Sequence, residues 1–123
     1  MIFNDSKPIY MQIVEIVCDK IASEVWRSEE RIPSVRELGS ELEVNPNTVM
    51  RAYEWLSEQG MIYNRRGIGF FVGPNALESI LMERRTTLLT TELRAIAQKM
   101  VQLDISLESV VEQLKRELGE IER

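Results

Sequence analysis

The sequence predicts a mainly helical protein in two parts, residues 1–73 and residues 74–123. In the first part, three segments with apolar residues at helical spacing come before two short β-prone segments. Three helices followed by a β-hairpin is the order of a winged helix-turn-helix domain. In the second part, two long apolar stripes recur at helical spacing, which predicts a C-terminal arm of two helices.

The first predicted helix covers residues 8–26. Its apolar side chains recur at steps of four residues, at Ile9, Ile13, Val17, Ile21 and Val25. This spacing puts them on one face of an amphipathic helix, and Pro8 suits the first turn because proline has no N–H to leave unpaired. Cys18 lies beside that face, so we expect it to be a half-buried packing residue and not a reactive thiol.

A second, shorter helix is predicted after a break at residues 27–33. Ser34 and Glu37 have the spacing of a capping box, in which each side chain binds the backbone N–H of the other residue. The helix should run to about Leu42, and Gly39 should let a neighbouring helix approach closely. The residues expected on its inner face are Val35, Leu38 and Leu42.

The third predicted helix runs from Pro46 to about Gln59 and stops at Gly60. Asn45 is a good N-cap, and proline is favoured at the first helical position. The residues expected on its buried face are Val49, Ala52, Tyr53 and Leu56. Those left facing outward are Asn47, Thr48, Met50, Arg51 and Glu54.

A β-hairpin is predicted next, with β-prone segments at residues 61–64 and 70–72. The connecting residues 65–69 include two glycines, which suit a tight turn. Arg65 and Arg66 are adjacent in this connection. The tip of the hairpin should therefore carry two positive charges.

The C-terminal part begins at Asn75, which caps a helix expected to continue to about residue 103. The threonines at positions 86, 87, 90 and 91 are poor helix formers, and we expect a bend near them. Ser106 caps a final helix. The N-terminal domain has no spare apolar surface for both stripes, and a second copy of the chain would supply it. The residues expected to form this dimer interface are Leu89, Leu93, Ile96, Met100, Leu107, Val111, Leu114 and Leu118.

The composition excludes most enzymes and metal sites. The chain has 123 residues, no His and one Cys, so it lacks imidazole bases, His-ligated metals, Cys clusters and an intramolecular disulfide. Gly67 and Gly69 are too close together, and lie in a hairpin, so they do not make a phosphate loop. We therefore expect no enzyme, no catalytic residue, no metal and no cofactor. No segment has a signal sequence or the ~18 apolar residues of a membrane span, which predicts a cytoplasmic protein without a membrane partner.

A formal net charge of −5 argues at first sight against a nucleic-acid partner. None of the segments 1–24, 25–74 and 75–123 is basic overall. A case for DNA therefore depends on where individual arginines lie. In its favour, the outward Asn, Thr and Arg residues fall on the first two turns of the third helix, which enters the major groove in this fold.

Five motifs in residues 8–73 resemble, in order and at the expected separations, the DNA-binding domain of the GntR family of bacterial transcription regulators. The motifs are Pro8-Ile9-Tyr10-x-Gln12-Ile13, Ile32-Pro33-Ser34-Val35-Arg36-Glu37-Leu38, Asn45-Pro46-Asn47-Thr48-Val49-x-Arg51-Ala52-Tyr53, Glu58-x-Gly60 and Arg65-Arg66-Gly67-x-Gly69-x-Phe71-Val72. The start of the third helix and the short helical extension resemble the YtrA subfamily. That resemblance implies dimerisation through the C-terminal helices, no large ligand-binding domain, and in many members the control of a transporter operon.

The resemblance also implies which residues contact DNA. They are Ser34, Arg36, Asn45, Asn47, Thr48, Arg51, Arg65, Arg66 and Gly67. Arg36 would anchor a phosphate or a base edge, and the residues of the third helix would face the major groove, where Asn pairs with adenine and Arg with guanine. Arg66 and Gly67 would form a wing tip in the minor groove, with Arg65 on a phosphate.

The chain departs from the family pattern in two places. A glycine usually precedes the Leu-Pro-Ser stretch, whereas residues 26–31 read WRSEER here. Many members have arginine at the second position of the recognition helix and again four residues later, where this chain has Pro46 and Met50. The base contacts of those arginines do not transfer to this chain. Tyr53 keeps two open roles, packing in the core or a hydrogen bond to a phosphate.

From the sequence we expect a dimeric, sequence-specific transcription repressor that binds an inverted-repeat operator in double-stranded DNA. The net acidity is compatible with this function, because attraction to phosphate depends on the local placement of arginines. The main alternative is a winged-helix protein-interaction module, which predicts no salt-dependent affinity for DNA. A nucleoid-type protein would bind DNA without sequence preference. The sequence assigns no small-molecule effector.

Overall fold

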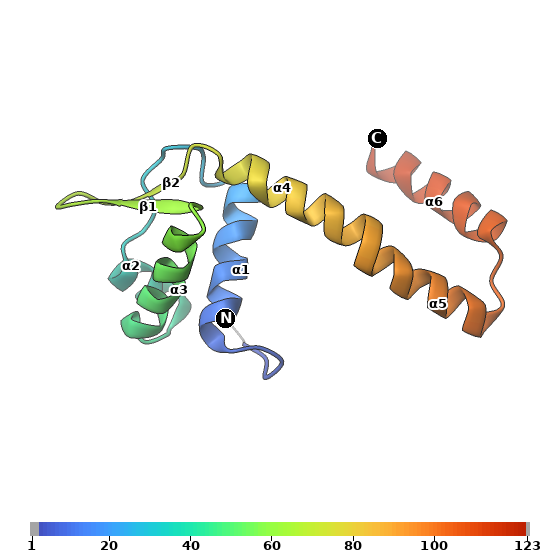
Figure 1. Cartoon of the computed structure of the whole chain (residues 1–123), viewed down its shortest axis with the longest axis horizontal. Helices are drawn as coiled ribbons and strands as arrows, with labels where there is room; N and C mark the ends of the chain where they lie inside the picture. Colours follow the sequence, from blue (N-terminus) through green and yellow to red (C-terminus); the bar gives the residue numbers. More distant parts are fainter. Residues whose placement is uncertain (1–2, 123) are drawn as a thin grey trace. The chain divides into compact units, whose positions relative to one another are not determined.

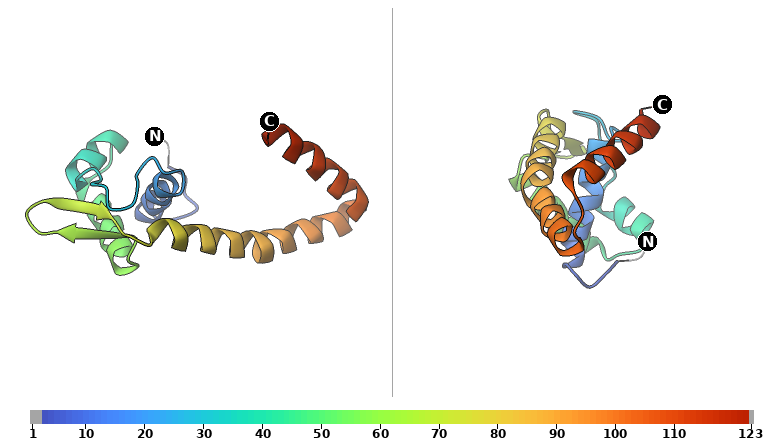
Figure 2. Two further views of the ribbon diagram at one scale, coloured as in Figure 1. Left: turned by 90° about the horizontal axis from the view of Figure 1, so that it is seen from above. Right: turned by 90° about the vertical axis from the view of Figure 1, so that its right-hand side faces the viewer.

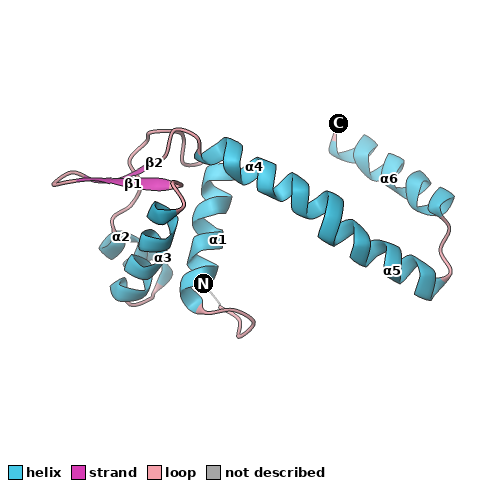
Figure 3. Cartoon of the chain, viewed as in Figure 1, coloured by secondary structure: helices cyan, strands magenta, loops and turns pink. Residues whose placement is uncertain are grey.

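The computed structural model describes residues 3–122 and is mainly helical, with one two-stranded antiparallel sheet (Figures 1 and 3). The elements in chain order are α1 (Ile9–Ala22), α2 (Val35–Leu42), α3 (Pro46–Glu58), β1 (Ile62–Arg65), β2 (Gly69–Val72), α4 (Ala76–Thr87), the π-helical turn η1 (Leu88–Glu92), α5 (Leu93–Leu103) and α6 (Leu107–Ile121). They form a winged helix followed by C-terminal helices, which confirms the predicted fold class. The chain divides after Glu83 into two compact units. Residues 1, 2 and 123, the ends of the predicted domain ranges, lie outside the described residues.

Helix α1 is shorter than predicted, because it ends at Ala22 and not near residue 26. The Ser23 N–H and hydroxyl both donate to the carbonyl of Asp19, at 3.0 and 2.7 Å. Glu24 then adopts a left-handed φ of 59°, and the Trp26 N–H returns to the Lys20 carbonyl at 3.0 Å. The chain leaves the helix before Val25, whose side chain is 57% exposed and so does not join the apolar stripe.

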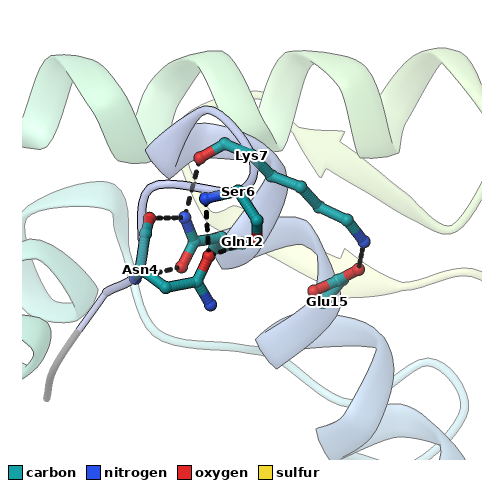
Figure 4. Close-up of polar contacts among 5 residues, drawn as sticks. All are labelled: Asn4, Ser6, Lys7, Gln12 and Glu15. Carbon is teal, nitrogen blue, oxygen red and sulfur yellow. Dashed lines mark hydrogen bonds and ion pairs between the residues drawn. The ribbon is translucent and has the colours of Figure 1, made fainter.

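The segment before α1 is held to the helix by the buried side chain of Gln12 (Figure 4). Its amide oxygen accepts from the Asn4 N–H at 3.1 Å, and its nitrogen donates to the carbonyls of Asn4 and Lys7 at 2.7 and 2.8 Å. Lys7 also forms an ion pair with Glu15. These contacts fix residues 4–7 against the first turns of α1.

Helices α2 and α3 begin as the sequence predicts. Ser34 Oγ accepts from the Glu37 N–H at 3.1 Å and the Glu37 carboxylate accepts from the Ser34 N–H at 2.9 Å, which confirms the capping box. Asn45 Oδ1 accepts from the Asn47 N–H at 2.8 Å and caps α3. A Cβ at Gly39 would lie 3.0 Å from the carbonyl oxygen of Val44, so this glycine allows the turn between the helices to pass closely.

The core of the first unit lies between α1, α2, α3 and the hairpin. All four residues predicted for the inner face of α3 are fully buried. The residues of the core are Ile13, Val14, Val17, Ile21, Ile32, Leu38, Leu42, Val49, Ala52, Tyr53, Leu56, Ile62, Val72, Ala76 and Ile80. Cys18 is half-buried against this core, as expected of a packing residue.

The hairpin projects beyond the helices of its unit (Figure 2). Ile62 pairs with Val72, and Arg65 pairs with Gly69, so the turn itself is residues 66–68. The segment before α2 pairs with the other side of β2: the Glu29 N–H donates to Val72 at 2.9 Å, and the Ile32 N–H donates to Phe70 at 2.9 Å. This extended stretch, which includes part of the WRSEER sequence, therefore connects the wing to the start of α2.

The first turns of α4 belong to the first unit. Ala76 and Ile80 are buried in its core, and Leu77 packs against it partly buried. The expectation that the N-terminal domain offers no surface to the C-terminal stripe is therefore wrong for these residues, because the core is completed by α4. From Arg84 onward the chain belongs to the second unit.

The second unit continues from the end of α4 through η1 and α5 to α6. The threonine-rich stretch, where we expected a bend, contains the π-helical turn, and Thr90 Oγ1 donates to the Thr86 carbonyl at 2.6 Å. Asp104, with a left-handed φ of 53°, ends α5, and Ser106 caps α6 by accepting from the Ser109 N–H at 3.1 Å. No residue of η1, α5 or α6 is buried. Among the described residues, no helix is long and apolar enough to cross a membrane.

Candidate nucleic-acid interface

The outward face of α3 carries its predicted polar residues in a defined order. At about 100° per residue, Asn47 and Glu54 lie at the centre of this face, with Met50 on one side and Arg51 on the other. All four side chains are exposed. Thr48 lies further round the helix and is half-buried. The helix therefore presents different chemistry at its two edges, a thioether at one and a guanidinium at the other.

At the Met50 edge, α3 meets the wing and the start of α2. A depression of about 290 Å³ lies here, and it is lined by Arg31, Ile32, Ser34, Val35, Arg36, Met50, Ile68, Gly69 and Phe70. Arg36 and Ile68 are exposed at its rim. Of the predicted DNA-binding residues, the structure thus brings Ser34 and Arg36 into one surface with the base of the wing.

At the other edge of α3, the Arg51 guanidinium lies over the ring of Tyr10, with its Cζ 4.1 Å from the ring centroid. Arg51 does not line the depression. The predicted DNA-binding residues of α3, Asn47, Thr48 and Arg51, therefore lie at the centre of the outward face and toward the Arg51 edge, and none of them lines the depression.

Two predicted DNA-binding residues act as helix caps in the structure. The Ser34 hydroxyl and the Asn45 side-chain oxygen each accept a backbone N–H at a helix start. The Ser34 cap also holds the pKa of Glu37 below its usual range, because two hydrogen bonds to Ser34 favour the ionised carboxylate, with a smaller effect from the charge of Arg31. These caps set the starts of the two helices that carry Arg36 and Asn47.

The wing carries its two arginines differently. The Arg65 guanidinium lies 5.2 Å from the ring centroid of Phe71, which in turn stacks on Tyr63 at 5.8 Å. Arg66 and Gly67 are exposed at the tip. Gly67 has a left-handed φ of 78°, and a Cβ there would meet no atom within 4 Å, so glycine is required by the turn and leaves the tip narrow.

Arg31 is a surface residue of this region that the sequence motifs did not point to. It forms a β-bridge with Phe71, and a Cβ at Gly69 would lie only 3.0 Å from Arg31 Nε. The glycine thus makes room for a third arginine beside the wing. Its pairing with β2 depends on contacts across 40 residues of chain, for which the local sequence carries no signal.

Tyr53 lies beneath this surface and does not reach it. Its side chain is fully buried, its hydroxyl donates to the Pro33 carbonyl at 2.7 Å, and its ring meets Phe70 edge-on at 4.9 Å. Of its two open roles, packing in the core is the one that the structure supports. Among the described residues there is also no cluster of three or more His, Cys, Asp or Glu that could hold a metal ion.

The apolar residues predicted for dimerisation form exposed stripes in the second unit. Leu93 and Ile96 on α5 are 44% and 43% exposed, and Leu114 and Leu118 on α6 are both 53% exposed. Leu89, Leu107 and Val111 are also exposed, and Met100 is half-buried. The residues predicted for dimerisation are thus apolar side chains of which only Met100 is half-buried.

Residues 9–72, from the start of α1 to the end of β2, match the family described as bacterial regulatory proteins, gntR family. The chain belongs to the GntR family. The match spans every element just described around the depression and the wing, and it confirms the resemblance drawn from the five motifs. This GntR protein is therefore a DNA-binding transcription regulator.

Relatives extend the match beyond the winged helix. The HTH-type transcriptional regulator YhcF of Bacillus subtilis is 32% identical over 113 residues, 92% of each chain. The transcriptional repressor YtrA of the same organism is 31% identical over 112 residues, 91% of this chain and 85% of YtrA. The YtrA-like assignment is thus confirmed along nearly the whole chain, and both relatives are regulators and not enzymes.

Solved structures agree with the assignment. A GntR family transcriptional regulator from Listeria monocytogenes has a TM-score of 0.77 and 34% identity, and the match covers 93% of this chain and 98% of that one. The DNA-binding domain of AraR, crystallised in complex with operator ORR3, has a TM-score of 0.54 and 27% identity, covering 59% of this chain and 88% of that one. The winged helix of this GntR protein thus shares its fold with a domain that has been crystallised on DNA.

Proposed function

We propose that this GntR protein is a dimeric repressor that binds an inverted-repeat operator in double-stranded DNA. The observation that carries the proposal is the exposed surface formed by the α2 start, the outward face of α3 and the wing, on which Arg36, Arg51, Arg65 and Arg66 all lie. Two similar proteins support it: YtrA is a transcriptional repressor, and the AraR DNA-binding domain has been crystallised in complex with an operator.

In this proposal, α3 enters the major groove, and residues at different positions around the helix make different contacts with DNA. Asn47 reads a base at the centre of the helix face, while Thr48 and Arg51 contact the neighbouring phosphate or base edge. Arg36 binds from the first turn of α2, and Ser34 and Asn45 act at the interface through the helices that they cap. Arg66 and Gly67 approach the minor groove, and Arg65 binds a phosphate beside it.

The exposed stripes of α5 and α6 pair with those of a second copy, and the two-fold symmetry of the dimer explains why the operator is an inverted repeat. A protein that acts on the chromosome works in the cytoplasm of its bacterium. Regulation of a transporter operon is supported by the resemblance to the YtrA subfamily. No small-molecule effector is included in the proposal.

Selection of genomic DNA fragments by the full-length protein tests this function. We expect one enriched inverted repeat. A plot of the logarithm of the binding constant against the logarithm of the salt concentration should have a slope of about −5 to −7 if about six to eight phosphates are neutralised per dimer. Asn47→Ala should relax the preference at one position of each half-site. The matched variant Arg65→Ala should weaken binding to all sequences about equally, because a phosphate contact carries no sequence information.

Two results would contradict the proposal. Binding that is strong but equal for all fragments would indicate a nucleoid-type protein. Affinity for DNA that does not change with salt concentration, or no affinity at all, would favour the protein-interaction module instead.

A further inference from the structure

The contact between Arg51 and Tyr10 joins the recognition helix to α1 at the surface. Arg51 is exposed on α3, and its Cζ lies 4.1 Å from the centroid of the Tyr10 ring. Tyr10 is half-buried and packs against the core. An exposed arginine thus contacts an aromatic ring that packs against the core of the first unit.

The contact with the Tyr10 ring does not use the N–H donors of Arg51 in a conventional hydrogen bond. A guanidinium has five N–H donors, and a cation–π contact attracts its charge without supplying a hydrogen-bond acceptor. Within residues 3–122, the structure gives Arg51 no ion pair and no hydrogen bond to another side chain. The cation–π contact therefore restricts the side chain while its N–H groups have no side-chain acceptor within these residues and can bind a phosphate or a guanine.

Tyr10, whose ring lies under Arg51, packs against the core and follows a segment that is fixed by hydrogen bonds. The residue lies in the first turn of α1, and the segment before it is held down by Gln12, which binds the backbone of Asn4 and Lys7 (Figure 4). Tyr10 and Gln12 come from one sequence motif and have complementary effects here. Gln12 holds the preceding segment in place, and the ring of Tyr10 contacts Arg51 on α3.

The wing shows the same arrangement with other residues. Arg65 lies over Phe71, and Phe71 is supported by Tyr63 on the paired strand. Two of the arginines assigned to DNA thus have their guanidinium groups over aromatic rings. A long side chain loses much rotamer freedom when it binds, so an arginine that is already oriented loses less.

We propose that Tyr10 is a positioning residue for DNA binding, whose ring holds the Arg51 guanidinium at the edge of α3 with its N–H donors turned toward DNA. The proposal rests on the DNA-binding function proposed above. Tyr10 itself need not touch DNA. Its contribution passes through Arg51, and the contribution is lost when either member of the pair is removed.

A double-mutant cycle on the full-length protein tests the proposal, with the operator that the wild type selects as the probe. Tyr10→Leu should weaken binding about two- to five-fold per half-site, the effect expected of an exposed cation–π contact. Tyr10→Phe keeps the ring and should bind like the wild type. In the Arg51→Ala background, Tyr10→Leu should produce no further loss, whereas a general structural defect would weaken binding in both backgrounds.

A measurement without DNA checks the stack itself. The Arg51 side-chain proton resonances should be shifted by the ring current in the wild type and in Tyr10→Phe, and unshifted in Tyr10→Leu. Thermal unfolding of each variant shows whether the protein is folded at the temperature of the binding experiment.

The outcomes separate the two proposals. If the wild type selects an operator but Tyr10→Leu weakens binding equally with and without Arg51, or Tyr10→Phe is as weak as Tyr10→Leu, the positioning role is wrong and the regulator function stands. The absence of any ring-current shift at Arg51 would also overturn the positioning role. If the wild type selects no sequence and shows no salt-dependent binding, the regulator function fails first and the positioning role fails with it.

Discussion

At the scale of single residues, Tyr53 links the recognition helix to the start of α2. Its hydroxyl donates to the carbonyl of Pro33, the residue before the Ser34 cap. Burial raises the pKa of Tyr53 well above that of an exposed tyrosine, and the nearby carboxylates of Glu37 and Glu41 raise this pKa further. The folded protein therefore keeps a proton at Tyr53 under conditions in which the unfolded chain has lost it.

This raised pKa predicts how stability changes at alkaline pH. The unfolded tyrosine ionises near pH 10, and above that pH the unfolded state binds fewer protons than the folded state, so the free energy of unfolding falls as pH rises. The expected slope is about 1.4 kcal/mol per pH unit between the unfolded and folded pKa values. Denaturant unfolding of the wild type from about pH 8 to about pH 11 measures it.

Tyr53→Phe is the matched control, since it removes only the hydroxyl. At neutral pH it should lower the free energy of unfolding by about 1–2 kcal/mol, because the half-buried Pro33 carbonyl loses its donor. The gap between the two proteins should then close above about pH 10. If the free energies of unfolding of the two proteins run parallel with pH, Tyr53 is not the group that causes the loss of stability at alkaline pH. A selective loss of DNA affinity in Tyr53→Phe would instead support a hydrogen bond from Tyr53 to a phosphate.

At the scale of elements, the capping box ties the stability of α2 to the position of Arg36. Ser34→Ala removes the acceptor for the Glu37 N–H and should cost about 1 kcal/mol of stability. It should also lower the affinity for DNA, since Arg36 lies in the first turn that this cap fixes. Ser34→Thr keeps the hydroxyl and should retain both properties. Equal affinity of Ser34→Ala and Ser34→Thr for the operator would show that the cap serves stability alone.

The elements that sequence predicted correctly are those with local signals. The starts of α2 and α3 follow from Ser34 and Asn45, and the buried face of α3 follows from its apolar spacing. The early end of α1 was missed, because Glu24 at a left-handed φ is an uncommon conformation for a residue other than glycine. The pairing of Arg31 with β2 and the Arg51–Tyr10 stack were missed because they join segments distant in sequence.

At the scale of the whole molecule, the burial of Ala76 and Ile80 determines where the chain can be cut. A fragment of residues 1–83 keeps the complete core of the first unit and should fold as a monomer. A fragment of residues 1–73 lacks both side chains and should be less stable by about 2–5 kcal/mol, the range for loss of one large core residue. Denaturant midpoints of the two fragments measure the difference, and equal midpoints would place α4 outside the folding unit.

The same fragment of residues 1–83 isolates one DNA-binding domain from the stripes assigned to dimerisation. It should bind one half-site much more weakly than the full chain binds the operator, because contact at one half-site no longer keeps the second domain nearby. Placing both half-sites in one duplex should raise the affinity of the full chain and leave the affinity of the fragment unchanged. Equal affinities of fragment and full chain would contradict the proposed pairing of half-sites.

The exposed stripes of α5 and α6 predict the assembly of the whole molecule. Leu93 and Ile96 remain 44% and 43% exposed and belong to a stripe of exposed apolar side chains, and large exposed apolar patches mark interaction sites. A double substitution of Leu93 and Ile96 by Glu would bury unpaired charge between the two copies, which is strongly unfavourable, and should convert the dimer to a monomer.

Val101→Glu is the matched control for that variant. Val101 lies on the same helix, is 82% exposed and falls outside the stripe, so a charge there should leave the dimer intact. Sedimentation of the three proteins at micromolar concentration distinguishes the outcomes: the wild type and Val101→Glu as dimers, and the double variant as a monomer with steeply reduced operator affinity. A monomeric wild type would mean that these stripes serve another contact, and the reading of two half-sites by one dimer would fail.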